Sequence, residues 1–81
     1  MTRLLRMPEV MLMLGIRKSA VYNMVNDGTL TSPVKMGKKT SLWPDYEVQA
    51  IVKAIIESKN RKELKALVND LMESRSSSGR L

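Results

Sequence analysis

The spacing of hydrophobic residues predicts a first helix over residues 8–14. Pro8 suits the first helical turn, where its missing N–H leaves no hydrogen bond unmade. Gly15 suits the position after the helix, because glycine adopts the positive φ that closes a helix end. Leu12 points away from the other hydrophobic residues. Those residues share one face: Val10, Met13 and Leu14, with Met11 at its edge.

A second helix is predicted over residues 18–27, with Val21 and Val25 one turn apart and Met24 beside them. Gly28 again suits the helix end. Only residues 15–17 separate the two helices. A short turn containing glycine between two short helices is typical of a helix-turn-helix, although many other helical hairpins share this spacing.

Alternating hydrophobic residues then predict a β-hairpin over residues 29–43, with its turn at residues 37–39. A short extended segment, residues 3–6, precedes the first helix. Trp43 lies where the hairpin returns to the next helix, so we expect it in the core. The hydrophobic residues of the hairpin are Leu30, Pro33, Val34, Met36, Leu42 and Trp43.

Two amphipathic helices are predicted in the second half, over residues 45–58 and 60–74. Asn60 and Glu63 form an asparagine variant of the capping box before the latter. Residues 75–81 are rich in serine and are expected to be a disordered tail. The stripe of the third helix is Val48, Ile51, Val52, Ile55 and Ile56, and that of the fourth is Leu64, Leu67, Val68, Leu71 and Met72.

We expect the stripe of the fourth helix to mediate self-association. A helix of this length is marginal in water without packing, and the third helix already supplies a stripe to close the core. A second copy of the chain would therefore cover it. The alternative is that the fourth helix packs back on its own domain. In either case we expect residues 1–58 to form the main domain, which is mainly α with a small β-hairpin, followed by the separate helix over residues 60–74.

Composition argues against an enzyme. The 81 residues suffice for about one domain, and they include no His and no Cys. The usual general base, the commonest metal ligand and the thiolate nucleophile are therefore missing. Asp45 and Glu47 are neighbouring acids, but no nucleophile or base accompanies them. We predict no catalytic residues, no metal site and no cofactor.

The charge is positive and uneven. The net charge is +6, and residues 1–42 carry seven basic side chains against two acidic ones, a net +5. Such a field attracts a polyanion, although a basic surface without a specific partner is the alternative. The longest uncharged run, Ser19–Asn26, is far shorter than the ~20 residues of a membrane span, and no signal peptide is recognised. The absence of cysteine fits a reducing interior such as the cytoplasm.

Two stretches carry a resemblance to a known family, RLLRMPEV at residues 3–10 and SPVKMGKKTSLW at residues 32–43. With Leu14–Ile16, Val21–Tyr22 and Asp27–Gly28, they resemble the AlpA family of prophage regulatory proteins over roughly residues 3–58. That family is similar to phage excisionases and to the DNA-binding part of MerR regulators. The resemblance implies a winged helix-turn-helix whose wing is the hairpin. It also implies a role in excising a prophage or genomic island, by activating an integrase gene or as a recombination directionality factor. Such a role implies a cytoplasmic, nucleoid-associated bacterial protein.

The second helix departs from the family's pattern. The usual N-cap serine is Arg17, a usual threonine is Ala20, and a usual basic residue after the tyrosine is Asn23. Loss of the cap costs ~1 kcal/mol. A cation near a helix N-terminus is also unfavourable, unless a DNA phosphate lies beside it. Because of these departures, the resemblance does not indicate which DNA sequence this protein would recognise.

The polar residues of the second helix are the candidates for reading bases. Arg17 or Lys18 could donate to guanine, and Asn23 could pair with adenine. The alternatives are a solvated helix face and, for Tyr22, packing under the wing. The candidate DNA contacts of this helix are Arg17, Lys18, Ser19, Tyr22, Asn23 and Asn26.

The hairpin would meet phosphates or the minor groove. Lysines at a hairpin can instead serve only to block edge-to-edge aggregation. Arg3 and Arg6 either flank the DNA or are merely solvated. The candidate DNA contacts of the hairpin are Lys35, Lys38, Lys39, Thr40 and Ser41.

Three functions are compatible with the sequence. The first is a sequence-specific regulator of a prophage or genomic island that binds double-stranded DNA, as a homodimer or in cooperative assembly, with an integrase as a further partner. The second is a protein-interaction module that inhibits or recruits another regulator through Leu12 and the fourth helix. The third is a DNA-binding domain like that of a phage terminase small subunit. No membrane partner is expected.

Overall fold

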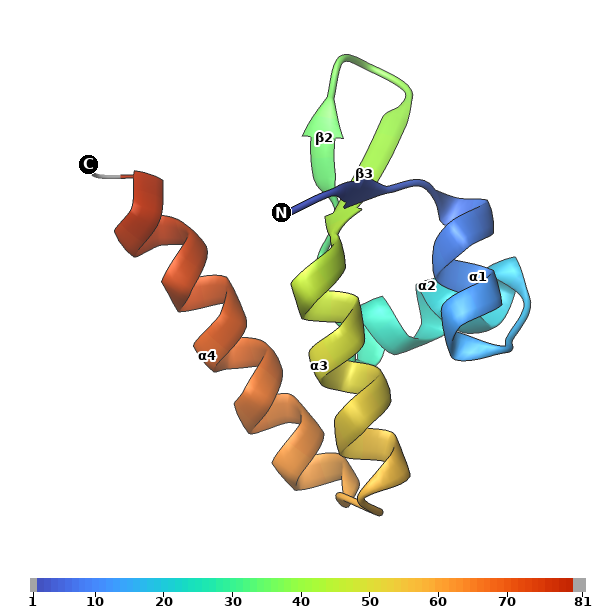
Figure 1. Ribbon diagram of the computed structural model, residues 1–81, viewed down its shortest axis with the longest axis vertical. Coiled ribbons are helices and arrows are strands. Elements are labelled where there is room, and N and C mark those ends of the chain that lie inside the picture. Colours follow the sequence, from blue (N-terminus) through green and yellow to red (C-terminus); the bar gives the residue numbers. More distant parts are fainter. Residues whose placement is uncertain (1, 80–81) are drawn as a thin grey trace.

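A computed structural model of the protein describes residues 2–79, with side chains through Arg75. Figure 1 shows a helical body from which a β-hairpin rises, with the last helix running along one side. This mainly helical fold with a small sheet confirms the predicted fold class. The elements are β1 (Leu4–Leu5), α1 (Met7–Leu14), α2 (Lys18–Asp27), β2 (Val34–Met36), β3 (Thr40–Pro44), α3 (Asp45–Ile56) and α4 (Arg61–Gly79).

Glycines end the first two helices where the sequence places them. Gly15 and Gly28 have φ of 69° and 84°, in the left-handed region that glycine tolerates. The N–H of Gly15 donates to the carbonyl of Met11 at 2.7 Å and satisfies one of the last carbonyls of α1. Between α1 and α2 the chain turns within residues 15–17, so the two helices pack against each other as a helix-turn-helix.

The sheet joins the start of the chain to the hairpin. Its strand order is β1-β3-β2, and both pairs are antiparallel. Leu5 pairs with Trp43, and the N–H of Asp45 donates to the carbonyl of Arg3 at 2.8 Å. The short segment before α1 is therefore fixed to the base of the hairpin, from which β2 and the outer part of β3 extend as the wing.

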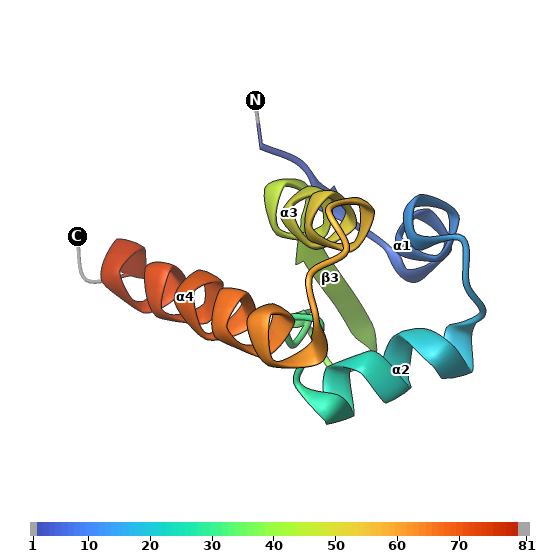
Figure 2. The ribbon, with the colours of Figure 1, turned by 90° about the horizontal axis from the view of Figure 1, so that it is seen from below.

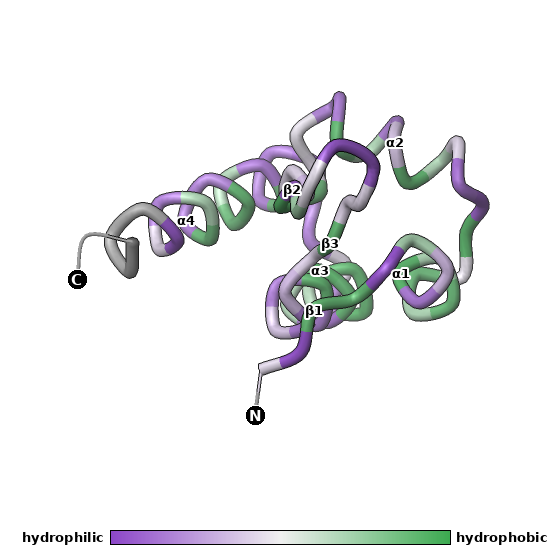
Figure 3. Tube along the Cα trace, turned by 90° about the horizontal axis from the view of Figure 1, so that it is seen from above, coloured by the Kyte–Doolittle hydropathy of each residue, from purple (hydrophilic) through white to green (hydrophobic). Residues whose placement is uncertain are grey.

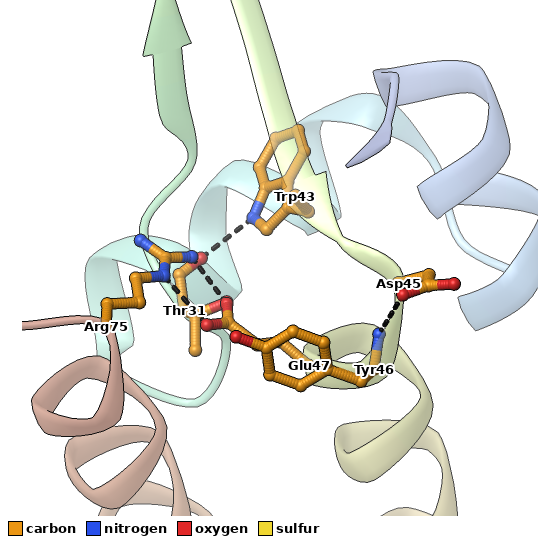
Figure 4. Close-up of polar contacts among 6 residues, drawn as sticks. All are labelled: Thr31, Trp43, Asp45, Tyr46, Glu47 and Arg75. Atoms are coloured by element: carbon orange, nitrogen blue, oxygen red, sulfur yellow. Dashed lines mark hydrogen bonds and ion pairs between the residues drawn. The ribbon is translucent and has the colours of Figure 1, made fainter. Parts of the chain in front are cut away.

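Trp43 is the largest fully buried side chain. Its indole N–H donates to the carbonyl of Thr31 at 2.8 Å, so the segment that follows α2 is held against the base of the wing (Figure 4). Around it lie buried residues from β1 and from the first three helices. They are Leu5, Val10, Val21, Val48 and Ile51.

The stripe predicted on the third helix is only partly buried. Val48 and Ile51 are fully buried, but Ile55 is 45% exposed and Ile56 is 76% exposed. α3 ends at Ile56 rather than at residue 58, and its last turn extends beyond the core. The inference that α3 alone closes the core is therefore wrong.

The helix α4 also contributes to the core. Val68 is only 7% exposed and belongs to the core, and Leu64 is half-buried. Leu67, Leu71 and Met72 pack against the same core. The hydrophobic stripe of α4 therefore packs on its own domain. We expected self-association because this stripe would otherwise be uncovered, and that reason does not hold.

The predicted capping box at the start of α4 is present. The backbone N–H of Asn60 donates to the carboxylate of Glu63 at 3.2 Å, and the backbone N–H of Glu63 donates to the side-chain oxygen of Asn60 at 2.8 Å.

The expected disordered tail is also corrected. α4 continues to Gly79, and Arg75, assigned to the tail, donates to the carboxylate of Glu47 through two guanidinium nitrogens, Nε at 2.7 Å and Nη2 (Figure 4). Glu47 is fully buried, and the side chain of Arg75 is 20% exposed. Residues 80 and 81 of the predicted tail lie outside the described residues. The pair fixes the far part of α4 to the first turn of α3.

We expect Arg75→Ala to lower the free energy of unfolding by about 3 kcal/mol, because it leaves a buried carboxylate without its cation. Urea denaturation followed by circular dichroism measures this. The matched control is Arg61→Ala, which removes an exposed pair with Asp27 at 3.3 Å and should cost about 1 kcal/mol or less. Equal losses in the two variants would show that the Glu47–Arg75 pair has no special structural role.

Candidate nucleic-acid interface

α2 presents its polar residues to solvent. It buries Val21 against the core and lies at the edge of the molecule, below α1 and α3 in Figure 2. Residues at positions 19, 22, 23 and 26 share one helical face. All six candidate contacts of the helix are exposed: Arg17, Lys18, Ser19, Tyr22, Asn23 and Asn26.

Arg17 occupies the N-cap of α2 with extended backbone, φ −82° and ψ 163°, and its side chain makes no capping bond. An arginine side chain has no acceptor for the first N–H groups of a helix. α2 also has no acidic residue in its first turn. The start of α2 is therefore an uncompensated positive end that favours an anion.

The wing carries its cations at the turn. Gly37 has φ of 78°, and Lys38 and Lys39 follow it, both exposed. Figure 3 shows that the turn of the hairpin and the segment entering α2 are among the most hydrophilic parts of the trace. Lys35 pairs with Ser41 across the strands and donates from Nζ to its Oγ at 2.6 Å. Lys35 thus contributes charge to the side of the wing.

A cleft of about 270 Å³ joins α2 to the wing. It brings together five of the predicted contacts, two from α2 and three from β3 and the turn before it. Both cations and hydroxyl groups line it, and no Asp or Glu is among its lining residues within the described chain. The predicted contacts that line it are Lys18, Tyr22, Lys39, Thr40 and Ser41.

Tyr22, which is 39% exposed, faces the cleft rather than packing fully under the wing.

The remaining predicted contacts lie outside this cleft. The other exposed candidates extend the polar surface along α2 and around the tip of the wing. They are Arg17, Ser19, Asn23, Asn26, Lys35 and Lys38.

The cleft also includes three residues outside the predicted contact set, Arg6, Met7 and Pro8 at the start of α1. The sequence left Arg6 open, as a residue that either flanks the DNA or is merely solvated. A signal for Arg6 existed in the sequence. Pro8 marks the first turn of the helix, which places Arg6 immediately before it. Only the pairing of β1 with β3 brings that helix start beside the wing.

A second hollow is of a different kind. It lies between α3 and α4, has a volume of about 450 Å³ and is lined by both signs of charge, namely Lys53 and Lys59 with Glu57, Glu63 and Asp70. Because positive and negative side chains both line this hollow, it does not present the positive electrostatic field that would attract a polyanion. Among the residues that the structure describes, no three acidic residues lie close enough to hold a metal ion.

The fold and this cationic surface define a winged helix-turn-helix protein in which α2 is the exposed second helix and the hairpin is the wing. The family model described as prophage CP4-57 regulatory protein (AlpA) matches residues 3–54. The chain belongs to this AlpA family, which indicates a phage-associated, DNA-binding regulator.

A search of curated proteins agrees with this assignment. The chain is 34% identical to the uncharacterized protein ORF88 of Enterobacteria phage P4 over 59 residues, which cover 73% of this chain and 67% of the relative. No solved structure matches the chain significantly. In the part that the structure describes, none of the helices combines the length and the hydropathy needed to span a bilayer.

We expect Arg17→Ser to stabilise the free protein by about 1 kcal/mol, because serine supplies the missing cap of α2 and removes a cation from the helix N-terminus. The same change should weaken DNA binding. Thermal unfolding and fluorescence anisotropy with labelled duplex DNA measure the two effects. Arg17→Ala is the control, since it removes the charge without adding a cap. A lower melting temperature for Arg17→Ser would contradict the assignment of position 17 as the cap.

Proposed function

We propose that the protein binds double-stranded DNA with α2 in the major groove and the wing along the adjacent backbone. The observation that carries this proposal is the cleft shared by α2 and the wing. Lys18 on one side and Lys39 on the other face the same space, which no described carboxylate lines. A DNA strand placed there would meet both elements at once, as phosphate contacts from two elements fix a protein's position on a duplex.

Sequence preference would come from the exposed face of α2. Arg17 and Lys18 lie at the start of the helix, where one or the other could donate to the acceptors of guanine. Asn23 lies on the solvent side and could pair with adenine through its amide. The wing lysines would contact phosphates, which contribute affinity with little base preference.

We further propose that this binding regulates a prophage or genomic island, by activating an integrase gene, by acting as an excisionase, or by both. The support is membership of a family of prophage regulatory proteins. Electrophoretic mobility shift with DNA from the chain's own genetic island, tiled across the integrase promoter and the attachment site, separates the two outputs. Binding at the promoter alone would favour activation, and binding at the attachment site would favour excision.

A protein-interaction module is less well supported. That alternative relied on the apolar face of α4, which instead packs on the chain's own core. Leu12 remains 83% exposed, but a single leucine is an ordinary surface feature. The arrangement therefore favours the DNA-binding function over recruitment of another regulator through α4.

The affinity for DNA should fall steeply with salt. If the protein neutralises ~4–6 phosphates, the logarithm of the binding constant should fall with the logarithm of salt concentration at a slope of roughly −4 to −5. Anisotropy titrations between about 50 and 200 mM salt test this. An affinity that does not change over this range would contradict the proposed function.

The wing and α2 should contribute differently. Lys38→Ala and Lys39→Ala should weaken binding to all sequences about equally, because their contacts are with phosphates. Asn23→Ala should cost ~1–3 kcal/mol on the preferred site and little on other DNA. Competition titrations with preferred and unrelated duplexes measure both. A larger change of base preference in the wing variants than in Asn23→Ala would reverse the assignment.

A further inference from the structure

Two arginines precede α1, and the structure separates their roles. The guanidinium of Arg3 lies 2.8 Å from the carboxylate of Glu9 and forms an ion pair with it. The other oxygen of Glu9 accepts the backbone N–H of Arg6 at 3.2 Å, so this carboxylate is engaged by Arg3 and by the helix cap. Among the described side chains, no carboxylate lies within 4 Å of the guanidinium of Arg6.

The backbone of Arg6 is held on both sides. Before it, Leu5 is buried and pairs with Trp43 in the sheet. After it, α1 begins at Met7, and the carbonyl of Arg6 accepts bonds from the N–H groups of Glu9 and Val10 at 3.0 and 3.1 Å. A charged side chain on such a fixed backbone loses less freedom when it binds a ligand than one on a mobile arm.

The side chain of Arg6 lines the cleft between α2 and the wing, with Lys18 and Lys39. Three cations from three parts of the chain therefore surround one space, together with the hydroxyl-bearing Tyr22, Thr40 and Ser41. A phosphodiester satisfies this set, since its oxygens accept from guanidinium, ammonium and hydroxyl groups alike. The planar fork of arginine suits two oxygens of one phosphate.

We propose that Arg6 is a third element of the DNA interface, which binds a backbone phosphate between the major groove occupied by α2 and the adjacent backbone followed by the wing. The inference rests on the proposed function and adds to it a specific residue and a specific ligand group. Arg6 thereby sets the position of the duplex relative to both elements and makes no contribution to base preference.

The test is the salt dependence of binding to a labelled duplex of random sequence, measured by anisotropy for the wild-type protein and for variants. Arg6→Ala should weaken binding about tenfold at low salt and reduce the magnitude of the slope by about 1, as the loss of one phosphate contact requires. Arg6→Lys keeps the charge and should keep the slope, with a smaller loss of affinity because the fork is missing.

Two control variants distinguish the effect of the position of Arg6 from the effect of losing one positive charge anywhere in the protein. Arg3→Ala removes the neighbouring arginine, which is already paired with Glu9, and Lys53→Ala removes a cation that lines the hollow between α3 and α4. Both should leave the slope nearly unchanged. Melting curves verify that each variant is folded, and Arg6→Ala keeps the backbone cap at Glu9.

The outcomes separate the inference from the proposed function. If the wild-type protein binds DNA with a steep slope but Arg6→Ala has the same slope, the role of Arg6 is overturned and the proposed function stands. A reduction of the slope by Arg3→Ala or Lys53→Ala as large as that by Arg6→Ala would also overturn it, since net charge alone would explain the effect. If the wild-type protein fails to bind duplex DNA at low salt, the proposed function and this inference both fail.

Discussion

The geometry of the candidate interface depends on the burial of Trp43. Its strand position pairs with Leu5, which precedes the start of α1, and its indole N–H is bonded to Thr31, which follows the end of α2. A buried N–H must find an acceptor, because leaving it unpaired costs about 1–3 kcal/mol. One side chain therefore sets where the wing, α1 and α2 lie relative to one another. The cleft between them is a consequence of that packing.

Local signals in the sequence predicted most of the elements. Gly15 and Gly28 end helices because few other residues adopt positive φ, and the capping box at Asn60 begins α4. The exposure of the polar residues of α2 followed from the positions of Val21 and its neighbours on the opposite face. These features depend on residues close together in the sequence, which is why the pattern reveals them.

The features that the sequence did not predict depend on distant residues. The periodicity that placed Ile55 and Ile56 in the core holds along α3, but the core does not extend to its last turn. Arg75 lies in a serine-rich segment with little hydrophobic pattern, and its partner Glu47 is 28 residues away. Arg3 and Arg6 are equivalent in composition, and only the tertiary positions of Glu9 and of the wing distinguish them.

The ion pair between Glu47 and Arg75 also bears on where the folding unit ends. The family match ends at residue 54, inside α3. A fragment cut there would lose Val68 from the core and would leave the buried carboxylate of Glu47 without its guanidinium. Such a fragment would retain the helix-turn-helix and the wing in its sequence but would lack part of the packing that supports them. For dissection of this protein, the family match and the packed core therefore end at different positions in the chain.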